Sequence, residues 1–413
     1  MVEFVNNLCT RAREAQKSLG SSLDKRGAIL RSAVRIMREM KTEILAENAK
    51  DLEAAEKNGL PYSMLDRLRL TEDRLQSICQ GVLDVVAQED PLGKGTVQRL
   101  SNGLNVQRIQ VPLGVICMIY EARPNVTADA AALSIMSGNV VILKGGKEAI
   151  CSNIILAEAF RKAAGEHGVS PDIVQAVTNT DRGVVAELLT RRGEIDLVIP
   201  RGGRALIDHV VTHSTVPVIE TGAGNCHIYV EKTADVDMAV RIVHNAKTSR
   251  PAVCNAVETV LCDREIAPAF LPALYRSLNE ANVEIRGCAE TLQYMDAKPA
   301  TDEDYATEYN DYILAVKVVS DIGEAIAHID RYTTRHSEAI VTTSMQAAAR
   351  FTGEVDAAAV YVNASTRFTD GGVFGLGAEI GISTQKLHVR GPFGLSALVT
   401  TKYVIQGDGQ IRS

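Results

Sequence analysis

The chain has 413 residues, 46% of them hydrophobic and 23% charged, and its formal net charge is −7. This length suits two or three domains of ordinary size. The acidic balance and the lack of a Lys/Arg-rich block argue against binding to nucleic acid or to a membrane surface. No apolar run approaches the roughly 18 residues that a membrane span needs, and the N-terminus lacks an apolar signal region. We therefore expect a globular cytoplasmic protein.

The first part of the chain is predicted to be helical. Residues 1–16 have the periodicity of an amphipathic helix, and apolar residues within 24–58 recur at spacings of three and four. The glycine and proline of "NGLP" end that second helix. Thr71 is a good N-cap for a helix that runs to about Gln88. Asn102 and Gly103 stand between alternating segments, which predicts a β-hairpin at about 96–111.

Strand-like and helical segments alternate after the hairpin. The strings "GVICMIYEA", "NVVILKGG", "EIDLVIPRGG" and "VPVIETGAGN" are predicted to be buried parallel strands, with helices at about 126–136 and 149–164 and at "RALIDHVVTH". The strings "NAVETVLC", "YILAVKVVS", "EAIVTT" and "AAVYVNAS" continue the pattern. The glycine-rich "FTDGGVFGLGAEIG" is predicted to be a loop, and the last segment an edge strand or a tail. The pattern indicates α/β, doubly wound parallel sheets, which bind ligands at the carboxyl ends of their strands.

The eight cysteines are scattered, with no C-x-x-C pair and no Cys/His spacing typical of zinc, so we expect no metal site. In a reducing compartment they are free thiols, and a free cysteine is often a buried packing residue. Composition and spacing therefore leave two roles open for Cys254 in "RPAVCNAVET": a reactive thiol or a small core residue.

The chain resembles the aldehyde dehydrogenase superfamily and, within it, the γ-glutamyl phosphate reductase family. The strings "YEARPNVT", "RPAVCNAVET" and "NASTRFTDGG" carry the resemblance, which covers essentially the whole chain. It implies an aldehyde-dehydrogenase-like fold with two doubly wound α/β domains. A cofactor domain would span 1–225 and include the hairpin as an oligomerisation arm. A catalytic domain would span 226–375, and a return segment with an arm strand would span 376–413.

The resemblance also implies a reaction, the NADPH-dependent reduction of γ-glutamyl phosphate to glutamate semialdehyde in proline biosynthesis. Cys254 would be the nucleophile and would form a thioester that accepts hydride. Asn125 would donate a hydrogen bond to the oxyanion. The alternative for Asn125 is a turn residue after a proline.

Five residues are implied to bind the cofactor. Lys144 matches a lysine that contacts the adenosine ribose or its phosphate. Lys147 stands where NAD-using relatives often carry a ribose-binding glutamate, so a cation there favours the 2′-phosphate of NADPH. Gly202 and Gly203 would let the backbone approach the cofactor, and Glu308 would contact the nicotinamide ribose. The alternatives are solvated lysines and a plain strand-to-helix turn.

Arg123, Arg250 and Arg367 lie in the family strings and are candidates to bind the substrate phosphate and carboxylate, with salt bridges as the alternative. Glu220 matches the general base of oxidising aldehyde dehydrogenases, but the residues after it differ, and we assign it no role. Two other functions stay open, a hydrolysing NAD(P)-dependent aldehyde dehydrogenase and a binding protein without activity. Implied partners are a small-molecule substrate, further copies of the chain, and glutamate 5-kinase in transient contact.

Overall fold

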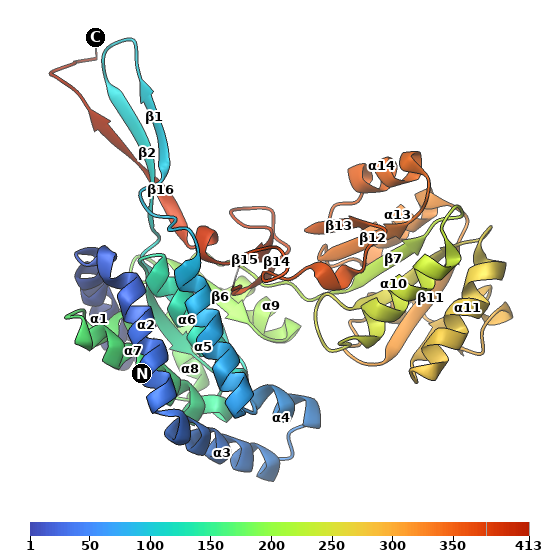
Figure 1. The fold of residues 1–413 in the computed structure, drawn as a ribbon, viewed down its shortest axis with the longest axis horizontal. Helices are drawn as coiled ribbons and strands as arrows, with labels where there is room; N and C mark the ends of the chain where they lie inside the picture. The colour runs from blue at the N-terminus through green and yellow to red at the C-terminus, as the bar shows by residue number, and fades with distance from the viewer. Residues whose placement is uncertain (377, 413) are drawn as a thin grey trace. The chain divides into compact units, whose positions relative to one another are not determined.

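The computed structural model describes residues 1–376 and 378–412, and Gly377 and Ser413 lie outside the described residues. The chain divides into two compact units. Unit 1 comprises residues 1–221, 375–381 and 393–413, and unit 2 comprises residues 222–374 and 382–392. Each unit contains one parallel sheet and its own helices (Figure 1), so the predicted α/β fold is confirmed.

The sheet of unit 1 has four parallel strands in the order β5-β4-β3-β6. They are β3 (Val115–Tyr120), β4 (Val140–Lys144), β5 (Val174–Ala176) and β6 (Leu197–Arg201). All residues of β3 and β4 are buried, as expected for parallel strands with both faces covered. The helices of unit 1 are α1 (Val2–Gly20), α2 (Arg26–Glu39), α3 (Lys41–Lys57), α4 (Tyr62–Leu68), α5 (Glu72–Ala87), α6 (Pro124–Met136), α7 (Ile150–Glu166), α8 (Arg182–Leu189) and α9 (Arg204–His213).

The N-terminal helices agree with the sequence pattern except at one position. The Thr71 side chain caps α5 by accepting a hydrogen bond from the Arg74 N–H, as predicted. The single helix expected within 24–58 is instead two helices, α2 and α3, separated at Met40. Both pack on α7, but only α2 packs broadly on α5, while α3 turns to α4. One straight helix could not place its apolar residues against both sets of neighbours.

The predicted hairpin is formed by β1 (Gly95–Arg99) and β2 (Asn105–Pro112), which pair antiparallel. At its tip Asn102 Oδ1 accepts a hydrogen bond from the Leu104 N–H at 3.2 Å, and Gly103 has a φ of 90°. β16 (Val399–Gln406) pairs antiparallel with β2, so the C-terminal segment is a strand rather than a tail. The three strands lie side by side and extend away from the helices of unit 1 (Figure 1).

The prediction of a strand at "VPVIETGAGN" is wrong. This segment forms only an isolated bridge, in which Val218 pairs with Val198 of β6. Pro217 has no N–H for a ladder, although its carbonyl accepts a hydrogen bond from the Val198 N–H at 2.9 Å. The glycines at 222 and 224 then weaken any continuation.

The sheet of unit 2 has seven parallel strands in the order β10-β9-β11-β8-β7-β12-β13. They are β7 (Cys226–Val230), β8 (Val257–Asp263), β9 (Glu284–Gly287), β10 (Lys298–Pro299), β11 (Ile313–Val319), β12 (Ser337–Val341) and β13 (Ala359–Val362). The helices are α10 (Val236–Thr248), α11 (Ala267–Glu280), α12 (Asp302–Ala306), α13 (Ile322–Tyr332) and α14 (Met345–Glu354). A two-stranded sheet of β14 (Gly381–Ser383) and β15 (Gly391–Phe393) lies where the chain passes between the units.

Successive residues of β7 place their side chains on opposite faces of this sheet. Ile228 and Val230 pack in a core with α10 and α11, and Tyr229 packs in a second core with Phe351 of α14. The sheet is therefore covered on both faces, as in a doubly wound fold.

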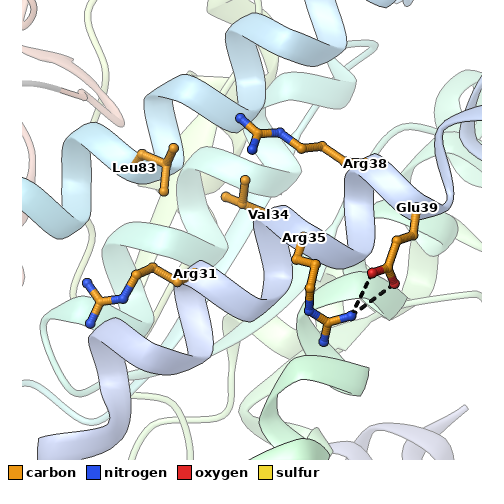
Figure 2. Close-up of a pocket in the computed structure, with 6 residues that line it drawn as sticks. All are labelled: Arg31, Val34, Arg35, Arg38, Glu39 and Leu83. Carbon is orange, nitrogen blue, oxygen red and sulfur yellow. Dashed lines mark hydrogen bonds and ion pairs between the residues drawn. The ribbon is translucent and has the colours of Figure 1, made fainter.

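A surface groove of about 370 Å³ lies between α2 and α5 (Figure 2). Its lining residues are Arg31, Val34, Arg35, Arg38, Glu39 and Leu83. None of the predicted site residues is among them.

No helix in the described part of the chain is both long enough and apolar enough to cross a membrane.

Candidate active site

The carboxyl edge of the unit 1 sheet gathers most of the predicted cofactor residues. β3 ends just before Arg123 and Asn125, β4 ends at Lys144, and β6 ends just before the glycines at 202 and 203. Because β4, β3 and β6 are adjacent and parallel, these positions share one edge of the sheet. Ligands of doubly wound sheets bind at this edge.

Asn125 lies in the first turn of α6, where Arg123 is the N-cap and Pro124 begins the helix. Proline suits this position because its fixed φ matches the helix and its missing N–H has no intrahelical partner there. The Asn125 side chain is exposed, and its Nδ2 donates to Asp129 Oδ2 at 3.1 Å. Asn125 therefore presents a carboxamide at the edge of the sheet.

The two lysines differ in environment. Lys144 is only 7% exposed, its Nζ donates to the Gly145 carbonyl at 3.1 Å, and burial lowers its pKa. Lys147 is exposed at the start of a 3₁₀ turn, Lys147–Ala149. Lys144 is thus held close to the sheet, whereas Lys147 extends into solvent and can reach an anionic group.

The turn after β6 packs against a carboxylate that the sequence analysis did not single out. The Gly203 N–H donates to Glu121 Oε2 at 3.1 Å. A Cβ at Gly202 would meet Glu121 Cδ at 2.6 Å, so only glycine fits there without displacing Glu121. Gly203 is also the N-cap of α9, so backbone N–H groups point to this turn.

In unit 2, Cys254 lies in the loop between α10 and β8 and is partly exposed. Gly224 and Cys226 both contact the backbone carbonyl of Cys254. A Cβ at Gly224 would overlap the Cys254 carbonyl, and Cys226 Sγ donates to that carbonyl oxygen at 3.2 Å. The close approach of Gly224 requires a glycine and fixes the position of the cysteine loop.

The predicted arginines Arg250 and Arg367 lie near this cysteine. Burial lowers the pKa of Arg367, the nearby charge of Arg250 lowers it further, and Cys254 acts in the opposite direction. Arg367 Nε donates to Ser249 Oγ at 3.1 Å, and its Nη1 donates to Asn255 Oδ1. The Arg367 guanidinium thus interacts electrostatically with both Arg250 and Cys254, and a guanidinium group in such a place suits an anion.

Asn255, which directly follows Cys254, is 5% exposed. Its Nδ2 donates to the Thr369 carbonyl at 2.9 Å, and its own carbonyl accepts from Thr366 Oγ1 at 2.7 Å. These bonds join the cysteine loop to the Arg367 turn. The sequence analysis missed this role, although the position directly after the cysteine was a signal.

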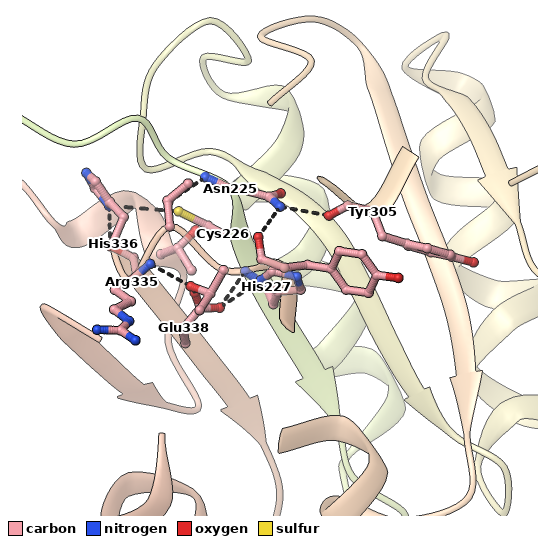
Figure 3. A network of polar contacts seen from close by, with 12 residues as sticks. Asn225, Cys226, His227, Tyr305, Arg335, His336 and Glu338 are labelled. Carbon is pink, nitrogen blue, oxygen red and sulfur yellow. Dashed lines mark hydrogen bonds and ion pairs between the residues drawn. The ribbon is translucent and has the colours of Figure 1, made fainter. Parts of the chain in front are cut away.

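Glu308 contacts the segment that packs against the Cys254 backbone. Its Oε1 accepts a hydrogen bond from the Gly224 N–H at 2.8 Å, so one carboxylate oxygen helps to hold Gly224 in place. A buried polar network lies alongside (Figure 3). Asn225 Nδ2 donates to the Tyr305 carbonyl at 2.8 Å, and Glu338 Oε2 accepts from the His227 backbone at 2.8 Å.

A buried ion pair connects the helix before the cysteine loop to the strand after it. Lys247, in the last turn of α10, places Nζ 2.5 Å from Glu258 Oε2 on β8, and both side chains are fully buried. Burial raises the pKa of Glu258 to about 7, against the opposing charge of Lys247. The pair therefore joins the two elements between which Cys254 lies.

Lys247→Met leaves the Glu258 carboxylate buried without its cation. We expect the free energy of unfolding at pH 8 to fall by about 3–5 kcal/mol. Protonation of Glu258 removes the unpaired charge, so the loss should be smaller at pH 5. Chemical denaturation followed by circular dichroism at both pH values measures this. The variant Lys247→Met/Glu258→Leu should recover most of the stability, and an equal loss at both pH values would contradict the prediction.

Most other cysteines resemble packing residues. Cys9, Cys79, Cys117, Cys226 and Cys262 are buried, and burial raises the pKa of each thiol, to about 12 in Cys9. Cys151 and Cys288 are partly exposed, like Cys254. Cys288 contacts Thr291 Oγ1 at 3.3 Å, and burial, followed by the charge of the Asp51 carboxylate, raises the pKa of Cys151.

The family model described as the aldehyde dehydrogenase family matches residues 2–291. The chain belongs to the aldehyde dehydrogenase family. A γ-glutamyl phosphate reductase from Carboxydothermus hydrogenoformans is 54% identical over 414 residues, which cover 100% of both chains. The crystal structure of γ-glutamyl phosphate reductase from Thermotoga maritima is 44% identical, has a TM-score of 0.96, and covers 98% of this chain and 99% of that one.

These comparisons confirm the resemblance to γ-glutamyl phosphate reductases within the aldehyde dehydrogenase family. The crystal structure of an acetylating aldehyde dehydrogenase from Geobacillus thermoglucosidasius is only 16% identical, has a TM-score of 0.71, and covers 100% of this chain and 98% of that one. At this identity the likeness supports the fold alone. Membership makes the chain an oxidoreductase of a family that uses nicotinamide cofactors.

Two further observations complete the site description. Glu220 is partly buried and follows the Val198–Val218 bridge in unit 1. Within residues 1–376 and 378–412, no group of three or more His, Cys, Asp or Glu side chains could hold a metal ion.

Proposed function

We propose that this chain catalyses the NADPH-dependent reduction of L-glutamate 5-phosphate to L-glutamate 5-semialdehyde and phosphate. The observation that carries the proposal is the partly exposed Cys254, which interacts electrostatically with Arg367 in a chain 54% identical to a γ-glutamyl phosphate reductase. The residues 1–225 would bind the cofactor, residues 226–375 would carry the nucleophile, and residues 376–413 would form the return segment and an arm strand.

In this reaction the Cys254 thiolate attacks the acyl carbon and forms a C–S bond, and the C–O bond to phosphate breaks. The thioester accepts a hydride, and the resulting tetrahedral thiohemiacetal anion then releases the aldehyde and restores the Cys254 thiolate. Asn125 donates to the oxyanion that develops on the acyl oxygen, with the Cys254 backbone N–H as a second donor. Arg123, Arg250 and Arg367 neutralise the phosphate and the α-carboxylate.

The carboxyl edge of the unit 1 sheet fits a nicotinamide dinucleotide. Lys144 and Lys147 supply cations there, and the Gly202–Gly203 turn presents backbone N–H groups at the start of α9. NADPH supplies the hydride when bound. Lys147 would hold the 2′-phosphate, Lys144 the adenosine ribose, and Glu308 the nicotinamide ribose.

Lys147→Glu should raise the Michaelis constant for NADPH at least tenfold and leave that for NADH unchanged or lower. A charge-assisted hydrogen bond contributes about 1.5–3 kcal/mol, and the new carboxylate adds repulsion against the phosphate. Initial rates with each cofactor measure the effect. The control Lys17→Glu reverses another exposed lysine, on α1, and should change neither constant. Equal losses for both cofactors would mean that Lys147 does not bind the 2′-phosphate.

Phosphate dependence tests the proposed reaction in reverse. The purified protein is given glutamate semialdehyde and NADP with and without inorganic phosphate, with arsenate as a substitute. NADPH formation that requires phosphate or arsenate supports the proposal. NADPH formation without either supports the hydrolysing aldehyde dehydrogenase, whose best feature here is the partly buried Glu220.

We also propose a homo-oligomer that forms through the β1-β2-β16 sheet. Val97, Tyr403 and Ile405 of this sheet are 70%, 64% and 60% exposed, more than expected for large apolar side chains that face only water. A partner strand or face would cover them. Proposed contact with glutamate 5-kinase, which would supply the labile acyl phosphate, and a cytoplasmic location complete the proposal.

A further inference from the structure

Asp129, on α6, is a partly buried carboxylate that the reaction steps above do not use. Within residues 1–376 and 378–412, the Asp129 carboxylate has one hydrogen bond, which it accepts from Asn125 Nδ2 at 3.1 Å. Over the same residues, Asp129 makes no ion pair, and the Asn125 side chain makes no other hydrogen bond. The two side chains are therefore each other's only hydrogen-bond partner, one helical turn apart.

We propose that Asp129 is a positioning residue that fixes the orientation of the Asn125 carboxamide. In this orientation the NH₂ group, which can donate a hydrogen bond, is presented at the site instead of the amide oxygen, which can only accept one. The proposal rests on the proposed role of Asn125 at the oxyanion. An ionised carboxylate only accepts hydrogen bonds, so the Asn125 group that faces Asp129 must be the NH₂. Its second N–H then diverges from Asp129 and is free to donate to substrate.

The surroundings of Asp129 couple this arrangement to pH. Burial raises the pKa of Asp129 to about 6, Glu379 acts in the same direction, and Arg201 on β6 and the Asn125 bond act in the opposite one. On α5, which packs on α6, Gly81 faces this carboxylate: a Cβ there would lie 4.0 Å from Asp129 Oδ1, and glycine places no charged group at that position. Above about pH 6 Asp129 is ionised and holds the amide in one orientation. Below it, a protonated Asp129 can donate to the amide oxygen, and the amide can flip.

The same burial makes Asp129 unfavourable for folding at neutral pH. Its folded pKa lies above the value of about 3.9 for an unfolded aspartate, so the native state loses stability as pH rises through about 6. A neutral isostere removes this cost. Asp129→Asn should therefore unfold at a higher temperature than the wild type at pH 8, and the difference should vanish toward pH 4.

Although Asp129→Asn should raise the stability at pH 8, we expect it to lower the catalytic activity. In Asp129→Asn either end of the new amide can face Asn125, so the donor is no longer fixed, and kcat at pH 8 should fall roughly tenfold, with KM changed less than about twofold. The ratio of wild-type to variant kcat should shrink toward one between pH 8 and pH 5. Ionisation of the phosphate substrate affects both proteins equally and cancels in this ratio.

The test measures kcat, KM and melting temperature of wild type, Asp129→Asn, Asn125→Ala and Asn125→Ala/Asp129→Asn between pH 5 and pH 8.5. In the Asn125→Ala background, Asp129→Asn should change kcat no further. The control Asp172→Asn removes a carboxylate that Arg11 and Arg161 hold by ion pairs, and should lower stability without changing kcat.

The outcomes separate the two levels of the proposal. If Asn125→Ala leaves kcat unchanged, the oxyanion role of Asn125 fails. If Asn125→Ala lowers kcat strongly but Asp129→Asn does not, or if the kcat ratio is constant across pH, Asp129 is not a positioning residue. Lower stability together with lower kcat in Asp129→Asn would indicate a structural role only.

Discussion

Cys254→Ser should fold normally and lose nearly all turnover, roughly 10⁴-fold or more in kcat, because a serine alkoxide is far harder to form than a thiolate. The side chain is partly exposed and interacts electrostatically with Arg367, which is proposed to bind the substrate's anionic groups together with Arg250. Steady-state rates in the phosphate-dependent assay measure the loss, and circular dichroism checks the fold.

The chain offers matched controls for this variant. Cys151 and Cys288 are the other partly exposed thiols, and Cys151→Ser and Cys288→Ser should keep most of the activity. Loss of activity on treatment with iodoacetamide should follow alkylation of Cys254, located by peptide mass spectrometry. Substantial turnover in Cys254→Ser would show that this thiol is a packing residue after all.

Asn125→Ala should lower kcat by about a hundred- to a thousandfold, because one donor to a developing oxyanion contributes about 3 kcal/mol in the transition state. The side chain is exposed at the first turn of α6, so we expect little change in melting temperature or in the Michaelis constant for NADPH.

Asn102→Ala is a matched control, since Asn102 is an exposed asparagine at the hairpin turn. It should leave kcat unchanged. If Asn125→Ala weakened cofactor binding while kcat stayed near the wild-type value, Asn125 would be a turn residue and not an oxyanion donor.

Local signals account for much of what could be predicted. The Thr71 cap, the hairpin tip at Asn102 and Gly103, and the apolar runs of β3 and β4 depend on neighbours in sequence, and each lies where the pattern predicts. The family strings extended the predictions to the site, because the resemblance implies chemical roles for Cys254 and Asn125, which remain proposals. Asp129 was within reach of the same reasoning, since it stands four residues after Asn125 on one helix.

Other features depended on partners that are distant in sequence. Whether "VPVIETGAGN" is a strand depended on the ladder with β6, which Pro217 interrupts. The break at Met40 depended on which helices cover α2 and α3.

By itself the sequence determined the α/β class, most of the elements, and the family, on which the proposed roles of Cys254 and Asn125 rest. Only the tertiary structure decided that Arg367 binds the cysteine loop at Ser249 and Asn255, and that Lys247 and Glu258 are paired in the core. The physical reason is that caps, turns and periodicity arise from residues a few positions apart. Burial, pKa shifts and ion pairs arise from groups that only the folded chain brings together.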